Sequence, residues 1–304
     1  MTRRPALGAV LPQAEIRPSD PLVVRDFAVQ VEAAGFDHLL AFEHVLGADS
    51  RARPGWDGYY DHTVPFLEPM TLFAYLAGAT ELELVTDILV APQRQTALLA
   101  KQAATVDVLT GGRLRLGVGI GWNEVEYVGL GVSFRSRARR LEEQIPLLRR
   151  LWTEEGVDHR GEFDVIDRAG INPLPVQRPI PLWIGCGDAA SALERVGRLA
   201  DGWIPHPALD DDDRLTAAWR TVREAAERAG RDPAALGMQG QVRYRETSMG
   251  EVTDRLGRWI DHGATHVSIN TLEGGPVWPH GHLDVIGEVG RLWQDALRST
   301  GDPG

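Results

Sequence analysis

The sequence has a single cysteine, few basic residues and no long apolar run, and each deficit excludes a class of protein. Cys186 alone cannot form an internal disulfide or a thiolate cage for a metal ion. The 32 Lys and Arg residues against 43 Asp and Glu residues give a net charge of −11, which opposes binding to nucleic acid and to anionic lipid. No stretch reaches the roughly 18 apolar residues that span a bilayer, and no signal peptide follows Met1. We therefore expect a cytoplasmic protein whose partners are neither nucleic acid nor membrane.

The composition is that of a folded protein with a large core. The 304 residues are 43% hydrophobic and 25% charged, which are ordinary globular values. This length fits one α/β barrel as well as two domains. Because no break in composition divides the chain, we predict a single domain over residues 1–304.

A short apolar run followed by an amphipathic segment recurs along the chain, which is typical of βα units around a parallel sheet. Eight such runs predict the α/β class and a (β/α)8 TIM barrel. The predicted strands are Leu7–Leu11, Leu39–Phe42, Leu82–Val90, Leu114–Val118, Pro181–Gly185, Gly202–Ile204, Leu236–Val242 and His266–Ile269. The predicted helices are Pro21–Ala34, Thr96–Leu109, Arg135–Trp152, Ala189–Ala200, Asp211–Ala229 and Glu251–His262, several of which stop at glycine.

Two segments interrupt this alternation, and they predict insertions after strands two and four. The first, Leu46–Pro65, carries Trp56, Tyr59 and Tyr60 among glycine and proline residues. Loops after strands form the active-site face of such barrels, so these aromatic residues are candidate substrate contacts on a lid. A solvated loop fits the composition equally well. The second segment, Glu154–Arg178, is polar and rich in proline.

Alternating glycines at Gly117, Gly119 and Gly121 mark the end of the fourth predicted strand. Without side chains, the strand end can approach a flat surface such as a planar ring, or pack tightly against its neighbours. The spacing differs from the dinucleotide-binding fingerprint, which needs a more distant third glycine and an acidic residue further on. Both interpretations therefore remain open at this stage.

A resemblance to a known family adds to this reading. The run AATVDVLTGGR at 103–113, followed by LGVGIGW at 116–122 and by Glu126, resembles the signature of the luciferase-like monooxygenase superfamily. Three further stretches agree in the right order. They are AAGFD at 33–37 leading into Glu43-His44, PLWIG at 181–185 leading into ADGW at 200–203, and GATHVSINT at 263–271. The similarity spans roughly residues 7–295 and is greatest to the deazaflavin-dependent oxidoreductases.

The resemblance implies a barrel that holds coenzyme F420 or FMN at the C-terminal ends of the strands, and it implies a homodimer. In the deazaflavin branch a cis peptide between non-proline residues backs the ring, and here it would fall at Leu89-Val90 or its neighbour. The residues expected to contact the cofactor are Leu89, Val90, Ala91, Gly119, Gly121, Trp122, Asn123, Glu126, Gly185, Cys186, Gly187 and Asp188.

Within that set, Gly185-Cys186-Gly187-Asp188 is the candidate phosphate site. Consecutive backbone N–H groups at the start of a helix favour an anion. Asp188 also fits the N-cap position of the helix that follows, and one residue can do both. Family members often have a second glycine where Cys186 stands, so the grip of this loop differs here.

His44 is the candidate catalytic residue, because it matches a position that often bears histidine and faces the ring in this family. It could give a proton to a reacting substrate, or serve as a structural histidine next to Glu43. Glu43 replaces an aspartate that is common in the deazaflavin branch. Trp122 stands where sugar-phosphate dehydrogenases of that branch have an acidic proton donor, which disfavours that substrate class. Glu126 either binds the cofactor or caps local structure.

The leading functional prediction is hydride transfer between F420 and a small organic substrate. The alternative is an FMN-dependent monooxygenase that uses reduced flavin and O2. A third hypothesis, a cofactor-free barrel that serves as a binding or dimer partner, is opposed by Gly117, Gly119, Gly121 and His44. The histidine positions show no recognised ligand spacing, so we expect no metal site.

Overall fold

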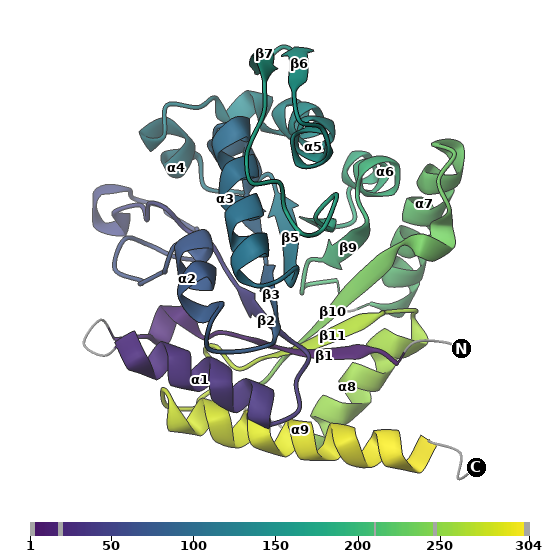
Figure 1. Ribbon diagram of the computed structural model, residues 1–304. Helices are drawn as coiled ribbons and strands as arrows, with labels where there is room; N and C mark the ends of the chain where they lie inside the picture. Colours follow the sequence, from purple (N-terminus) through teal and green to yellow (C-terminus); the bar gives the residue numbers. More distant parts are fainter. Residues whose placement is uncertain (1–3, 18–20, 210, 246–247, 301–304) are drawn as a thin grey trace.

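A closed parallel barrel forms the centre of the protein, as predicted. The computed structural model describes residues 4–17, 21–209, 211–245 and 248–300. Its strands follow the order β3-β2-β1-β11-β10-β9-β8-β5, and pairing of β3 with β5 closes the barrel (Figure 1). The bounds are β1 Ala6–Val10, β2 His38–Ala41, β3 Glu83–Thr86, β4 Leu89–Val90, β5 Leu114–Gly119, β8 Leu182–Cys186, β9 Gly202–Pro205, β10 Gly237–Arg243 and β11 His266–Asn270. The third predicted strand is therefore split into β3 and β4, which both pair with β5.

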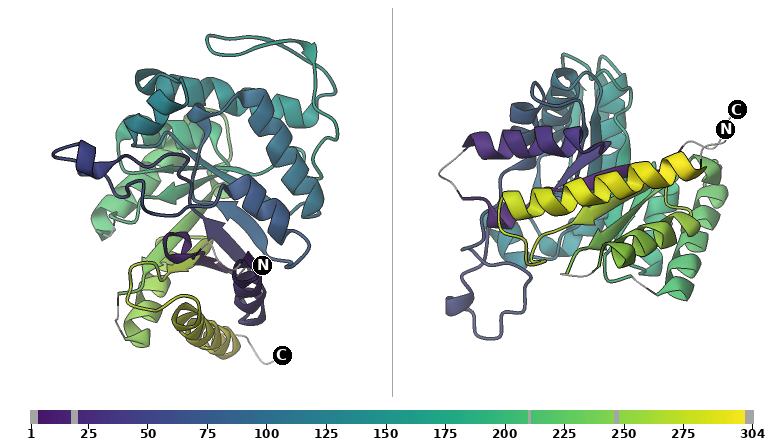
Figure 2. Two further views of the ribbon diagram at one scale, coloured as in Figure 1. Left: turned by 90° about the vertical axis from the view of Figure 1, so that its left-hand side faces the viewer. Right: turned by 90° about the horizontal axis from the view of Figure 1, so that it is seen from below.

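Helices surround the barrel, as both views in Figure 2 show. Their bounds are α1 Pro21–Ala33, α2 Pro69–Leu76, α3 Thr96–Leu109, α4 Glu124–Gly129, α5 Arg137–Thr153, α6 Ala190–Leu199, α7 Asp212–Arg228, α8 Met249–Asp261 and α9 His280–Thr300. Short 3-10 helices lie at Gln13–Glu15, Ser50–Ala52, Ala91–Gln93, Phe134–Ser136 and Pro233–Ala235. Side-chain caps begin several helices; the Asp211 carboxylate accepts from the Arg214 N–H at 2.8 Å. After α8, Gly263 takes the left-handed conformation at φ 93° that ends the helix.

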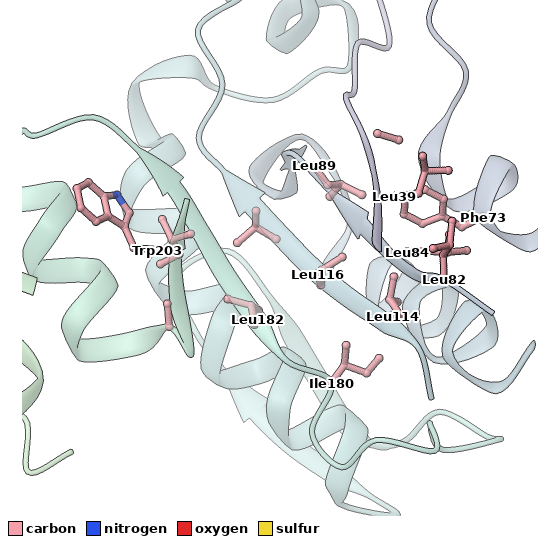
Figure 3. Packing of buried hydrophobic residues seen from close by; sticks show 14 of the residues in the cluster. Leu39, Phe73, Leu82, Leu84, Leu89, Leu114, Leu116, Ile180, Leu182 and Trp203 are labelled. Atoms are coloured by element: carbon pink, nitrogen blue, oxygen red, sulfur yellow. The ribbon is translucent and has the colours of Figure 1, made fainter. Parts of the chain in front are cut away.

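The main apolar core lies between the strands and the surrounding helices. Figure 3 shows Leu114, Leu116 and Leu182 projecting from neighbouring strands into this layer. Inside the barrel, toward the N-terminal ends of the strands, buried Arg115 donates to Glu83 at 2.8 Å and to Gln239 at 3.1 Å. These side chains fill the lower barrel, so a ligand site is left to the C-terminal ends of the strands.

Both predicted insertions are present. The segment between β2 and α2 protrudes from the barrel (Figure 2). The second insertion follows α5 and forms an antiparallel hairpin of β6 Val157–Arg160 and β7 Val165–Ala169. The Glu143 carboxylate of α5 accepts hydrogen bonds from the backbone of Glu162, Phe163 and Asp164, which fixes the hairpin turn against the helix.

Candidate functional site

A cavity of about 430 Å³ opens at the C-terminal ends of the strands. This volume lies in the range of small-molecule sites. Most of the residues selected from the sequence line it: His44, Tyr59, Tyr60, Val90, Gly119, Gly121, Trp122, Glu126, Gly185, Cys186 and Gly187. Five of them lie outside the lining: Trp56, Leu89, Ala91, Asn123 and Asp188.

The floor of the cavity is built by the Ile88 side chain over two glycines. A Cβ placed on Gly119 would lie 2.6 Å from Ile88 Cδ1, and one on Gly185 would lie 2.5 Å from Ile88 Cγ2. At Gly117 the space is taken by the Thr86 carbonyl oxygen, 2.0 Å from such a Cβ. The glycines therefore permit close packing within the barrel, and a planar ring would rest on Ile88 rather than on the glycines themselves.

A cis peptide lies at Asp87-Ile88, two residues before the predicted Leu89-Val90 position. After it, Ile88 faces the cavity, whereas Leu89 lies in the apolar core (Figure 3). Ala91 is fully buried in the same core. At this strand end Ile88 and Val90 line the cavity, whereas Leu89 and Ala91 do not.

Asp87 is a cavity residue that the sequence reading missed. Its Oδ2 atom accepts from the Gln241 side-chain amide at 2.8 Å, and its carboxyl group faces the cavity. Burial raises the pKa of Asp87 to about 6, opposed by the Gln241 hydrogen bond and by the nearby positive charges. The available signal was an acidic residue that interrupts the apolar run at 82–90.

His44 forms its hydrogen bond with Glu126 and not with Glu43, which was one of the two roles left open by the sequence. The His44 Nδ1 atom lies 3.3 Å from Glu126 Oε1, which also accepts from the N–H groups of Val45 at 2.9 Å and Leu46 at 3.2 Å. Burial works to raise the pKa of Glu126, but the hydrogen bonds from His44 and the backbone outweigh it and lower the pKa. These bonds support the reading of Glu126 as a structural cap that orients His44.

Glu43 instead fastens the strand end beneath the site. Its carboxylate accepts from the Val90 N–H at 2.6 Å and pairs with Arg94, which also pairs with Glu68 at 2.8 Å. Burial raises the pKa of Glu43, and the Arg94 charge opposes this change. The buried pair joins the segments after β2 and β4 into one support.

The aromatic insertion packs on Trp122 at the mouth of the cavity. Ring centroids of His44, Tyr59 and Trp56 lie 5.6, 5.4 and 5.8 Å from that of Trp122. These contacts distinguish the segment from a loop that is simply solvated. Asn123 lies behind this cluster, where it caps α4 and donates to the Leu46 carbonyl at 3.0 Å.

The candidate phosphate site lies at the start of α6. Gly187 lines the cavity, and nothing lies within 4 Å of a Cβ built on it, so its backbone is open. The N-cap prediction for Asp188 is wrong: Ala189 is the N-cap of α6, and no side chain forms a capping hydrogen bond there. The Asp188 carboxylate pairs with Arg214 at 2.7 Å, which draws it away from the helix. Burial raises the pKa of the Cys186 thiol to about 12.

Further lining residues at the ends of β9 and β10 were missed. They include His206, whose pKa is lowered by burial, and Gln241 and Arg243. Gln241 lies near the end of the predicted seventh strand and Arg243 directly follows it, and these polar residues at a strand end could have indicated the lining. Over the described ranges no three His, Cys, Asp or Glu side chains are grouped to hold a metal ion. Of the helices in the described part of the chain, none has the length and apolarity to cross a membrane.

Comparison with known proteins places this geometry in context. A family model described as luciferase-like monooxygenase matches residues 10–269. An uncharacterized protein of Mycobacterium tuberculosis strain H37Rv is 42% identical over 208 residues, covering 66% of this chain and 70% of that protein. An FMNH(2)-dependent dimethylsulfone monooxygenase of Pseudomonas fluorescens is 33% identical over 205 residues, covering 64% of this chain and 52% of that protein. The structure of an F420-dependent secondary alcohol dehydrogenase superposes with a TM-score of 0.79 at 18% identity, covering 94% and 98% of the two chains.

Proposed function

Since this chain belongs to the luciferase-like monooxygenase family, we propose that it is an oxidoreductase that uses coenzyme F420 for hydride transfer with a small organic substrate. The observation that carries the proposal is the cavity at the strand ends. Its aliphatic floor at Ile88 and Val90 leads to the open backbone of Gly187 at the start of α6.

The residues of the cavity fit a flat ring with a phosphate tail. Ile88 and Val90 offer an apolar surface for the face of a ring. The first N–H groups of α6 have no partner within the helix, and the helix start is a favourable position for a phosphate. We propose Gly185, Cys186 and Gly187 as the phosphate contacts, with Asp188 held aside by Arg214.

When bound, a deazaflavin supplies a carbon that carries two electrons as hydride. The side chains of this protein would place the substrate and handle the proton. His44 faces the cavity, and its Nδ1 atom donates to the Glu126 carboxylate. That bond leaves Nε2 as the nitrogen that exchanges a proton with the substrate. Tyr59 and Tyr60 line the same space and are proposed as substrate contacts.

A second candidate is an FMN-dependent monooxygenase, which is favoured by the 33% identity with the dimethylsulfone enzyme. In that reaction the protein must keep a reduced flavin away from bulk water. The Trp122 cluster, with Tyr59 over the mouth, would serve this purpose. Both candidates place a flat tricyclic ring on Ile88, so only the identity of the ring separates them.

The deciding experiment is titration of the purified chain with oxidised F420 and, separately, with FMN, monitored by cofactor fluorescence. We expect saturable F420 binding that is weakened at least about tenfold by Gly187→Asp, which sets a carboxylate against the phosphate. Gly78→Asp is the matched control, because nothing lies within 4 Å of a Cβ there either and it does not line the cavity. Tight FMN binding without F420 binding would select the monooxygenase. Binding of neither would leave the cofactor-free barrel. Light scattering of the same sample tests the proposed homodimer.

A further inference from the structure

A second hollow of about 520 Å³ adjoins the cavity at the ends of β10 and β11. The two share Phe42, Tyr59, Tyr60 and Arg243 in their linings, so they are direct neighbours. Arg243 is the last residue of β10, and it lines both hollows.

Arg243 differs from the other arginines that line or support the barrel. Arg94 pairs with two carboxylates, and Arg115 binds Glu83 and Gln239. In contrast, within the described ranges no hydrogen bond or ion pair involves the half-buried Arg243 guanidinium, and its Nε atom is buried without a partner. A charge that is partly withdrawn from water is stabilised by an anion, and the guanidinium of Arg243 is free to bind one.

The second hollow adds a further cation. Arg245 lines it two residues beyond Arg243, on an exposed stretch of the chain. Four acidic side chains face the two hollows. Glu273 lines the second, and Glu43, Asp87 and Glu126 line the first, where they bind Arg94, Gln241 and His44. None of the four forms an ion pair with Arg243 in the described part of the molecule. In the second hollow itself, two arginines face the single carboxylate of Glu273, in contrast with the net charge of −11 on the whole chain.

We propose that Arg243, assisted by Arg245, binds the carboxylate or sulfonate of the substrate, and that the substrates are small organic acids. A guanidinium offers parallel N–H donors that match two oxygens of such a group. The apolar part of the acid would lie against Phe42 and Tyr60, toward the Ile88 floor. That the bound acid is a substrate rests on the proposed function, but binding of the anion itself needs no cofactor.

The test measures binding by calorimetry of benzoate and its neutral counterpart benzamide to the cofactor-free protein, and of benzenesulfonate and benzenesulfonamide as a second pair. We expect each acid to bind at least about tenfold more tightly than its neutral partner, and Arg243→Gln to abolish that preference. Arg245→Gln should weaken the preference by a smaller factor. It lies on the surface and serves as a second variant if Arg243→Gln fails to fold. Arg228→Gln is the control, because that exposed arginine pairs with Glu194 on the outside of the barrel.

Three outcomes would overturn the inference. The first is equal affinity of the native chain for acids and neutral partners. The second is an unchanged preference in both arginine variants. The third is loss of F420 or FMN affinity in Arg243→Gln with acid binding retained, which would assign Arg243 to the cofactor. Because acids are titrated without cofactor, failure here is separable from failure of the cofactor titration.

Discussion

Replacing Asp87 with asparagine is expected to stabilise the protein at neutral pH and to have little effect in acid. Burial raises the pKa of Asp87 from its ordinary 3.8 to about 6. Because the pKa is higher in the folded state, protonated Asp87 contributes to the free energy of unfolding. This contribution is fully present below pH 3.8 and is lost as the pH rises through about 6. A shift of about two pKa units corresponds to ~3 kcal/mol once the group is ionised. Asparagine keeps an oxygen that can accept from Gln241 but carries no charge.

The assay is urea unfolding of both proteins, monitored by tryptophan fluorescence, from about pH 3 to about pH 7.5. We expect the free energy of unfolding of Asp87→Asn to exceed that of the native chain by ~3 kcal/mol at the upper end and by nearly nothing at the lower end. Asp61→Asn is a control of opposite sign, since hydrogen bonds from Thr63 and Ser50 lower the pKa of Asp61 to about 2. The reasoning is refuted if Asp87→Asn gives no stabilisation near neutral pH, or if its advantage does not shrink in acid.

Three further predictions concern the surroundings of the site. Glu126→Gln should destabilise the protein by about 1.5–3 kcal/mol at neutral pH, because the Glu126 carboxylate accepts charge-assisted hydrogen bonds. The loss should be smaller below the lowered pKa of Glu126, and urea unfolding at two pH values checks this. Cys186 should resist iodoacetamide at pH 8 in the folded chain and react in urea, since its pKa is raised to about 12; mass spectrometry that finds equal rates would contradict the burial argument. Gly117→Ala should lower the free energy of unfolding by about 1–3 kcal/mol, because the added methyl group meets the Thr86 carbonyl oxygen. Gly187→Ala has open space around it and should change the urea unfolding midpoint little.

The sequence predicted the barrel well because each strand is a local apolar run. Even the three-residue prediction Gly202–Ile204 corresponds to a real strand, β9. The third strand was predicted as continuous, but the cis peptide at Asp87-Ile88 breaks it, and one acidic residue gave too weak a signal for that. Helix α9 was missed because it begins directly after Trp278-Pro279 and has Gly281 in its first turn, a pattern that is typical of a loop.

The site was harder to predict than the fold because its contacts join distant parts of the chain. His44 and Glu126 were each selected from the sequence, but their bond spans 82 positions and leaves no local trace. Asp188 was predicted as a helix N-cap because it directly precedes the predicted helix. Its carboxylate instead accepts a hydrogen bond from Arg214, 26 residues further on. Which side of a strand end faces the cavity was also undetermined, and so Leu89 was selected in place of Ile88.

The position of Ile88 above Gly119 and Gly185 makes the depth of the cavity depend on the space above these two glycines. A methyl group added at either glycine would force this side chain upward, into the room that a ring would occupy. Ligand size in this barrel is therefore set partly from below, by backbone clearance between adjacent strands. Polar groups around the rim can then vary without changing how far a molecule can enter.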